Sequence, residues 1–64
     1  MYPVISRAVV SNDIHYLCHS YDNNERSYAV VEIVGDSKGR KAVGEGDNYQ
    51  RAIYDGISKL EASQ

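Results

Sequence analysis

The chain has 64 residues, 42% of them hydrophobic, and a net charge of −2, so it forms one small domain. The acidic balance argues against binding driven by nucleic-acid phosphates, which requires clustered Lys and Arg. No apolar run is long enough to span a membrane, and the first residues lack the regions of a signal peptide. One cysteine excludes an internal disulfide and suits a reducing compartment. The cytoplasm is therefore the expected location, that of the host cell if a phage encodes the chain.

The first third of the chain predicts two strands. Residues 4–10 have the β-branched composition of a strand, and a turn cluster follows at residues 11–13. Residues 14–21 are ambiguous. Their apolar side chains fall at helical spacing, but the short length, the Tyr and His content and the turn cluster at residues 22–24 favour a strand. We predict a strand here, as one arm of a hairpin.

Residues 27–34 predict a third strand, because they are almost all β-branched or aromatic. Alternation divides its side chains between two faces that are both largely apolar. One face carries Ala29, Val31 and Ile33, and the other carries Tyr28, Val30, Glu32 and Val34. After a glycine-containing turn, residues 40–43 resume an extended pattern.

Residues 47–62 predict an amphipathic helix with Asp47 or Asn48 as its N-cap. Its apolar stripe follows the helical period and consists of Tyr49, Ala52, Ile53, Gly56, Ile57 and Leu60. Arg51, Asp55, Ser58 and Glu61 are expected to face water. Gly56 destabilises a helix by about 1 kcal/mol relative to Ala, so we expect this glycine to let the helix lie close to the sheet.

Gly44 and Gly46 are interpreted as a sharp corner between the last strand and the helix. A phosphate cradle is disfavoured, because the third glycine and the parallel βαβ unit of a dinucleotide site are missing. The element order is thus β-β-β-β-α. It predicts an α+β fold, a small antiparallel sheet with one C-terminal helix packed on Ala29, Val31 and Ile33.

His15, Cys18 and His19 are the residues that suggest a metal or a nucleophile. On a helix they would share one face and could bind zinc. On a strand the two histidines lie about 13 Å apart, at roughly 3.3 Å per residue, and Cys18 faces away from them. The carboxylates are scattered, and no pair has the spacing of a general acid and base. We therefore predict no catalytic residue, no metal and no cofactor.

The second half of the chain resembles two known families. Gly44, Gly46, Asp47, Ala52 and Ile57 resemble the strand-to-helix signature of the regulatory domain of 2-isopropylmalate synthase. That domain is built from βββα units that pair and bind leucine. The resemblance implies a module that senses a small ligand, with the ligand near four residues. These are Gly44, Gly46, Asp47 and Asn48.

Residues 28–60 are also similar to the last strands and helix of the double-stranded-RNA-binding domain. This resemblance implies a first helix at residues 14–21 and a grip on phosphate at the start of the last helix. The family uses adjacent lysines there, whereas this chain has Tyr49 and Gln50. The resemblance implies double-stranded RNA binding as a third possible function of the chain.

The aromatic inventory favours a different function. All six aromatic residues are tyrosines, which suit half-buried surfaces and interfaces. One helix covers only one face of the sheet, so the other face is predicted to be an interaction surface. Its expected residues are Tyr16, Tyr21, Tyr28, Val30, Glu32 and Val34.

The leading hypothesis is a non-enzymatic interaction protein that inhibits or regulates another protein. By analogy, a short acidic chain without a catalytic set is typical of phage inhibitors of host or defence enzymes. The uncovered apolar face also predicts a homodimer, through that face or through the edge strand beside it. Neither nucleic acid nor a membrane is an expected partner.

Overall fold

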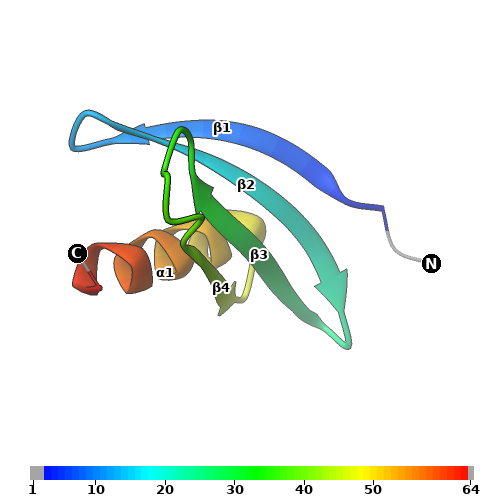
Figure 1. Cartoon of the computed structure of the whole chain (residues 1–64). Coiled ribbons are helices and arrows are strands. Elements are labelled where there is room, and N and C mark those ends of the chain that lie inside the picture. The colour runs from blue at the N-terminus through cyan, green and yellow to red at the C-terminus, as the bar shows by residue number, and fades with distance from the viewer. Residues whose placement is uncertain (1–2, 64) are drawn as a thin grey trace.

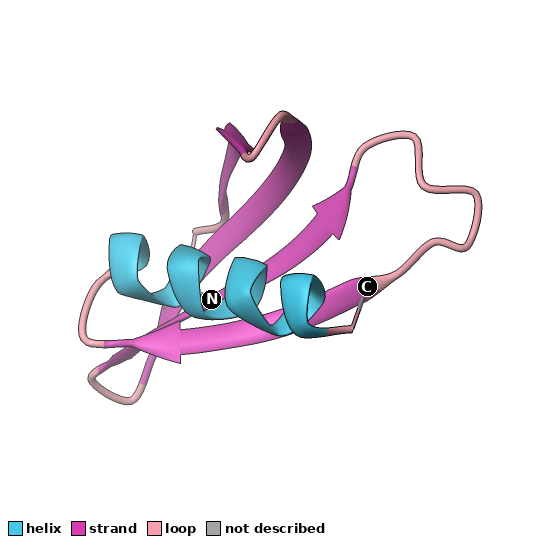
Figure 2. Ribbon diagram, turned by 90° about the vertical axis from the view of Figure 1, so that its left-hand side faces the viewer, coloured by secondary structure: helices cyan, strands magenta, loops and turns pink. Residues whose placement is uncertain are grey.

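The computed structural model describes residues 3–63 and has the predicted order of four strands and a closing helix (Figure 1). The elements are β1 (Ile5–Ser11), β2 (Ile14–Asn23), β3 (Arg26–Ile33), β4 (Lys41–Gly46) and α1 (Tyr49–Ala62). Neighbouring strands are antiparallel in the order β1-β2-β3-β4, so β1 and β4 are the two edges. Figure 2 shows α1 lying across one face of this sheet. The predicted α+β fold is confirmed.

The first two hairpins each turn within two residues. Asn12 and Asp13 join β1 to β2, and Asn24 and Glu25 join β2 to β3; all four have a positive φ between 51° and 68°. Two left-handed residues in succession match the right-handed twist of the strands, and Asn and Asp adopt this conformation at low cost. The turns place residues 14–21 in a strand, as predicted, and fix which side chains face α1.

The core lies between α1 and the sheet. The sheet contributes Tyr16, Cys18, Ala29 and Val31 to it, and α1 contributes Ala52, Ile53, Ile57 and Leu60. Ala29 and Val31 lie under the helix as predicted, and Ile33 is partly buried against the same cluster. The predicted stripe of α1 is buried from Ala52 onward, whereas Tyr49 at the helix start is half-buried.

Two glycines let the backbone of α1 lie directly on β4. A Cβ added to Gly44 would overlap the carbonyl oxygen of Ala52 and the backbone nitrogen of Gly56. A Cβ added to Gly56 would lie 2.6 Å from Cγ2 of Val31, which confirms the close approach expected for this residue. Gly44 and Gly46 are therefore strand residues beneath the helix. Their interpretation as a corner was wrong, because the chain turns only after Gly46.

The start of α1 is set by Asn48. Its Oδ1 accepts a hydrogen bond of 2.9 Å from the backbone N–H of Arg51, so the helix begins at Tyr49, later than the predicted residue 47. Asp47 lies outside the helix and forms an ion pair of 3.3 Å with Arg26. Of the two N-cap candidates, Asn48 is the one that caps.

Two charged side chains of α1 reach the outer edge of β4. Oδ2 of Asp55 accepts the backbone N–H of Glu45 at 3.0 Å. Nζ of Lys59 donates to the carbonyl oxygen of Val43 at 2.9 Å and pairs with Asp55 at 3.2 Å. Asp55 was expected to face water. Its side chain is 39% exposed, and it also bonds the strand, because the glycine contact brings the helix close to β4.

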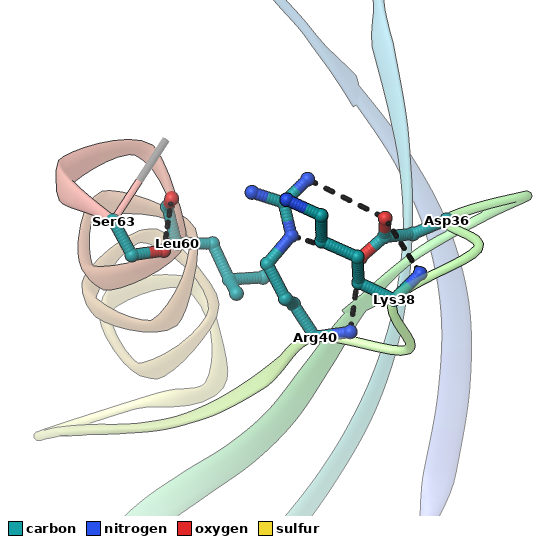
Figure 3. A network of polar contacts seen from close by, with 5 residues as sticks. All are labelled: Asp36, Lys38, Arg40, Leu60 and Ser63. Atoms are coloured by element: carbon teal, nitrogen blue, oxygen red, sulfur yellow. Dashed lines mark hydrogen bonds and ion pairs between the residues drawn. The ribbon is translucent and has the colours of Figure 1, made fainter.

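The β3–β4 connection is organised by Asp36 (Figure 3). Its carboxylate, 8% exposed, accepts the backbone N–H of Arg40 at 2.9 Å and of Lys38 at 3.3 Å. The guanidinium of Arg40 donates to the same carboxylate at 3.0 Å. These bonds, led by that of the Arg40 side chain, lower the pKa of Asp36 to about 2. At the other side of Figure 3, the Ser63 hydroxyl donates to the Leu60 carbonyl at 2.8 Å and closes the helix.

We expect Gly44→Ala to lower the free energy of unfolding by about 2–3 kcal/mol, because the new methyl group overlaps helix backbone. Urea denaturation followed by circular dichroism measures the change. The control is Val43→Ala on the same strand, whose side chain is 50% exposed, and it should cost less than about 1 kcal/mol. Equal stability of Gly44→Ala and wild type would contradict the close packing.

Asp36 predicts an acid-sensitive contribution to stability. Because its pKa is lowered from 3.8 to about 2 in the folded chain, its contribution is complete above about pH 4 and is lost as the pH falls towards 2. Asp36→Asn should therefore be less stable than wild type at neutral pH, and the difference should shrink through that range. Arg40→Met removes the main cause of the lowered pKa, so the acid-dependent contribution to stability should be smaller in this variant and its loss should be complete at a higher pH than in wild type. A difference that does not change between neutral pH and pH 2 would refute this assignment.

Candidate interaction surface

One face of the sheet has no helix on it, and we call it the open face. Side chains alternate between the two faces along each strand. Tyr16 and Cys18 of β2 are buried beneath α1, so the residues that alternate with them, and the residues paired with those on the neighbouring strands, lie on the open face. It consists of Ser6, Ala8 and Val10 of β1, His15, Leu17, His19, Tyr21 and Asn23 of β2, Arg26, Tyr28, Val30 and Glu32 of β3, and Lys41, Val43 and Glu45 of β4.

An aromatic pair marks one end of the open face. Tyr21 and Tyr28 are directly opposite each other on β2 and β3, with ring centroids 5.5 Å apart and planes inclined by 19°. Stacked rings of this kind add about 0.5–1.5 kcal/mol beyond their buried area. Both tyrosines are half-buried, and Glu45 is the neighbour of Tyr28 on β4. The pair presents a broad, rigid aromatic surface bordered by Glu45 on β4 and by Arg26, which lies two residues before Tyr28 on the same face.

The adjoining row of the open face is mainly apolar. Val30 lies between His19 and Val43, and Val43 is 50% exposed. His19 is held by its Nδ1, which lies 2.9 Å from the hydroxyl of Ser6 on β1. Together with the tyrosine pair, Val30 and Val43 form an apolar stripe across three strands.

A polar row borders this stripe. Glu32 and Lys41 lie opposite each other on β3 and β4 and pair at 3.7 Å. Leu17, the neighbour of Glu32 on β2, is half-buried. The ion pair is exposed enough to contribute little to stability, so its charges are available to orient a partner.

The structure brings together most of the predicted surface residues. Tyr21, Tyr28, Val30 and Glu32 all lie on the open face. Val34 follows β3 directly, donates its N–H to the His15 carbonyl at 2.9 Å and is 58% exposed. Tyr16 does not belong to this group, because it is fully buried beneath α1. Tyr21 lies five positions after Tyr16, and an odd difference in position along a regular strand puts two side chains on opposite faces.

The strand separates the three residues that suggested a metal or a nucleophile. His15 and His19 lie on the open face, whereas Cys18 is fully buried on the helix side. Residues 3–63 contain no group of three side chains placed to hold a metal ion. Burial raises the pKa of the Cys18 thiol, and the nearby positive charge of Arg7 opposes this only in part. A buried thiol with a raised pKa is a poor nucleophile.

The residues of the ligand hypothesis are divided between the core and the surface. Gly44 and Gly46 are buried under α1, where helix backbone fills the space around them. Asp47 and Asn48 border a hollow of about 290 Å³ at the start of the helix, which Tyr49 also lines. Gly46 also lines a second hollow of about 420 Å³ next to Asp47, so three of the four predicted residues border a space that a small molecule could enter.

The floor of this hollow is already hydrogen-bonded. The hydroxyl of Tyr49 donates to Oδ2 of Asp22 at 3.1 Å, and that of Ser27 donates to Oδ1 at 2.7 Å. Burial and the bond to Asp22 raise the pKa of Tyr49. The Asp22 carboxylate and the two hydroxyl groups are therefore hydrogen-bonded to one another, and the Tyr49 bond connects the β2–β3 hairpin to α1.

A groove between β1 and α1 was missed by the sequence reasoning. It has a volume of about 200 Å³ and is lined by Arg7, Val9, Gln50, Ile53 and Tyr54. Ile53 is buried at its base, and Tyr54 is 57% exposed. The groove arises because α1 covers β2, β3 and β4 but does not reach β1. Only the position of the helix on the sheet reveals it.

Comparisons of the chain with protein-family models, curated proteins and solved structures find no match. Within residues 3–63 there is no helix with the length and apolar character that crossing a membrane requires.

Cys18 is expected to react slowly with a water-soluble disulfide reagent while the chain is folded, because the thiol is buried and its pKa is raised. Its rate should be at least about 100-fold lower than in concentrated guanidinium chloride, since reaction requires local or global opening. The control is Ser58→Cys in a Cys18→Ala background, because residue 58 is exposed on α1 and should react at once. Equal rates for the two thiols would place Cys18 outside the core.

Proposed function

We propose that this chain is a non-enzymatic interaction protein that inhibits or regulates another protein by binding it with the open face. The observation that carries the proposal is the apolar stripe of Tyr21, Tyr28, Val30 and Val43, which no element of residues 3–63 covers. Contiguous apolar patches are uncommon on monomeric proteins and generally mark binding sites. Rigid tyrosines are also typical anchors of interfaces, since they bury a large area at small entropic cost.

The charges around the stripe indicate the kind of surface that it fits. Glu45 borders the tyrosine pair, Glu32 is shared with Lys41, and the chain as a whole carries a charge of −2. A partner with an apolar centre and a rim that carries both charges is complementary to this arrangement, because Arg26 and Lys41 lie on the open face beside Glu45 and Glu32. Complementary rim charges steer association and fix orientation more than they add affinity.

The regulatory role is drawn from the character of the chain. The chain is acidic, and its potential nucleophile Cys18 is buried with a raised pKa. By analogy, this suits an inhibitor of the kind that phages direct against host or defence enzymes. The predicted homodimer belongs to the same proposal, and it would form through the open face or through the edge strand beside it.

A ligand sensor is the second candidate, and one observation favours it, namely that Asp47 and Asn48 border the hollow at the start of α1. A thermal-shift screen with amino acids tests this, since a ligand at 100 times its dissociation constant stabilises by about 2.7 kcal/mol.

Double-stranded RNA binding is less well supported. The segment that would be its first helix is part of β2, and the helix start offers Tyr49 and Gln50 where that family has lysines.

The proposed function predicts that Val30→Lys removes partner binding, because it puts a charge in the middle of the apolar stripe. Tagged wild type, Val30→Lys and Ser58→Lys are compared by quantitative affinity capture from a lysate of the source cell. Ser58 is exposed on α1, away from the open face, so it serves as the matched control. A protein retained by wild type and Ser58→Lys should be at least about 10-fold depleted with Val30→Lys, as expected for loss of one central contact.

The captured protein is then purified, and its affinity for all three variants is measured by titration calorimetry. Circular dichroism checks that Val30→Lys remains folded. A partner that binds wild type and Val30→Lys equally would refute the open face as its binding site.

A further inference from the structure

α1 forms hydrogen bonds to one edge strand of the sheet, β4, but does not reach the other edge strand, β1. On β4, Asp55 bonds the backbone N–H of Glu45 at 3.0 Å, and Lys59 bonds the carbonyl of Val43 at 2.9 Å. These groups point away from β3 and would otherwise be free to pair with another strand. Charged side chains at an edge are a common device against edge-to-edge association. α1 therefore closes the β4 edge.

The β1 edge has no such protection. The two-residue turn makes Ser11 and Ile14 a hydrogen-bonded pair, so Val9 and Arg7 also bond inward to β2. The N–H and C=O groups of the alternate residues, Ser6, Ala8 and Val10, point outward. Within residues 3–63 no strand pairs with this side, and α1 does not reach it (Figure 1).

β1 also has the composition of a strand that pairs. Its seven residues contain neither proline nor glycine, and its one charge is Arg7. Ile5 is 42% exposed and Val10 is 60% exposed, so apolar side chains stand on both faces of the strand beside the unpaired backbone. A long, apolar, unprotected edge of this kind is a site for strand addition.

We propose that β1 pairs antiparallel with β1 of a second copy, with Ala8 opposite Ala8 of that copy, so that both sheets become one. This register uses the whole of β1 on each side and satisfies the outward groups of Ser6, Ala8 and Val10. It places Ser6 opposite Val10 and Arg7 opposite Val9 of the second copy. A register centred on Arg7 instead would put two like charges directly opposite each other, which is unfavourable.

The sequence of β1 is therefore compatible with pairing to a second copy of itself. This inference rests on the homodimer of the proposed function and specifies the interface through which that homodimer forms. The two-fold axis stands perpendicular to the joined sheet, so both helices lie on one side and both open faces on the other. On the helix side, the second strand also lies beside the groove lined by Arg7 and Val9. The dimer leaves the tyrosine stripes uncovered, so it is compatible with partner binding.

The test is analytical ultracentrifugation across micromolar concentrations, with matched proline variants at the two edges. Ala8→Pro removes an outward N–H and no bond of the β1–β2 ladder, which edge strands tolerate. We expect wild type to dimerise and Ala8→Pro to raise the dissociation constant about 100-fold, because two interface hydrogen bonds are lost. Val43→Pro makes the same change at the closed β4 edge and should leave dimerisation unchanged.

A cross-link tests the register independently of proline. In a Cys18→Ala background, Ala8→Cys should form an intermolecular disulfide on mild oxidation, because directly opposite Cα atoms of a hydrogen-bonded pair lie about 5.5 Å apart. Val43→Cys should not. A wild type that is monomeric at every concentration, or a dimer that Val30→Lys abolishes and Ala8→Pro does not, would overturn the proposal. Affinity capture with Val30→Lys tests only the open face, whereas ultracentrifugation with Ala8→Pro tests only the β1 interface. Failure of one proposal can therefore be distinguished from failure of the other.

Discussion

The contact of helix backbone with strand backbone at Gly44 and Gly56 is the constraint on which the rest of the structure depends. It brings α1 down over β4 and β3, where Val31 fills the space beside Gly56. From that position Asp55 and Lys59 reach the edge of β4. The same placement keeps α1 away from β1. One pair of glycines thus decides which part of the sheet is covered, which edge is closed and which edge is left free.

The core that results is small and one-sided. A chain of this length buries only about 60% of its unfolded surface, and within residues 3–63 no further element covers the apolar residues that α1 leaves open. Val30 and Val43 on the open face and Val10 on β1 are in this position. Their exposure is a consequence of covering a four-stranded sheet with a single helix. The open face and the β1 edge therefore have one physical origin.

Much of this architecture could be predicted from local patterns. The alternation in residues 27–34 identified the buried Ala29 and Val31, and the helical stripe identified the face of α1. The same alternation could have excluded Tyr16 from the surface of Tyr21, because the two residues are five positions apart, an odd number. The contacts of Asp55 and the groove at Arg7 could not be predicted, since they depend on where the helix lies across the strands. Spacing along the chain determines faces, but not the lateral position of one layer on another.

The two proposed surfaces use different parts of the sheet and can be occupied together. Strand pairing at β1 uses backbone groups in the plane of the sheet, whereas the open face presents side chains perpendicular to it. Joining two copies at Ala8 places two stripes of Tyr21 and Tyr28 on one continuous surface. A partner that is itself two-fold symmetric then engages both stripes, and the second contact forms at the high effective concentration set by the first. The proposed dimer is therefore expected to bind such a partner more tightly than one copy does, without an added contact to either stripe.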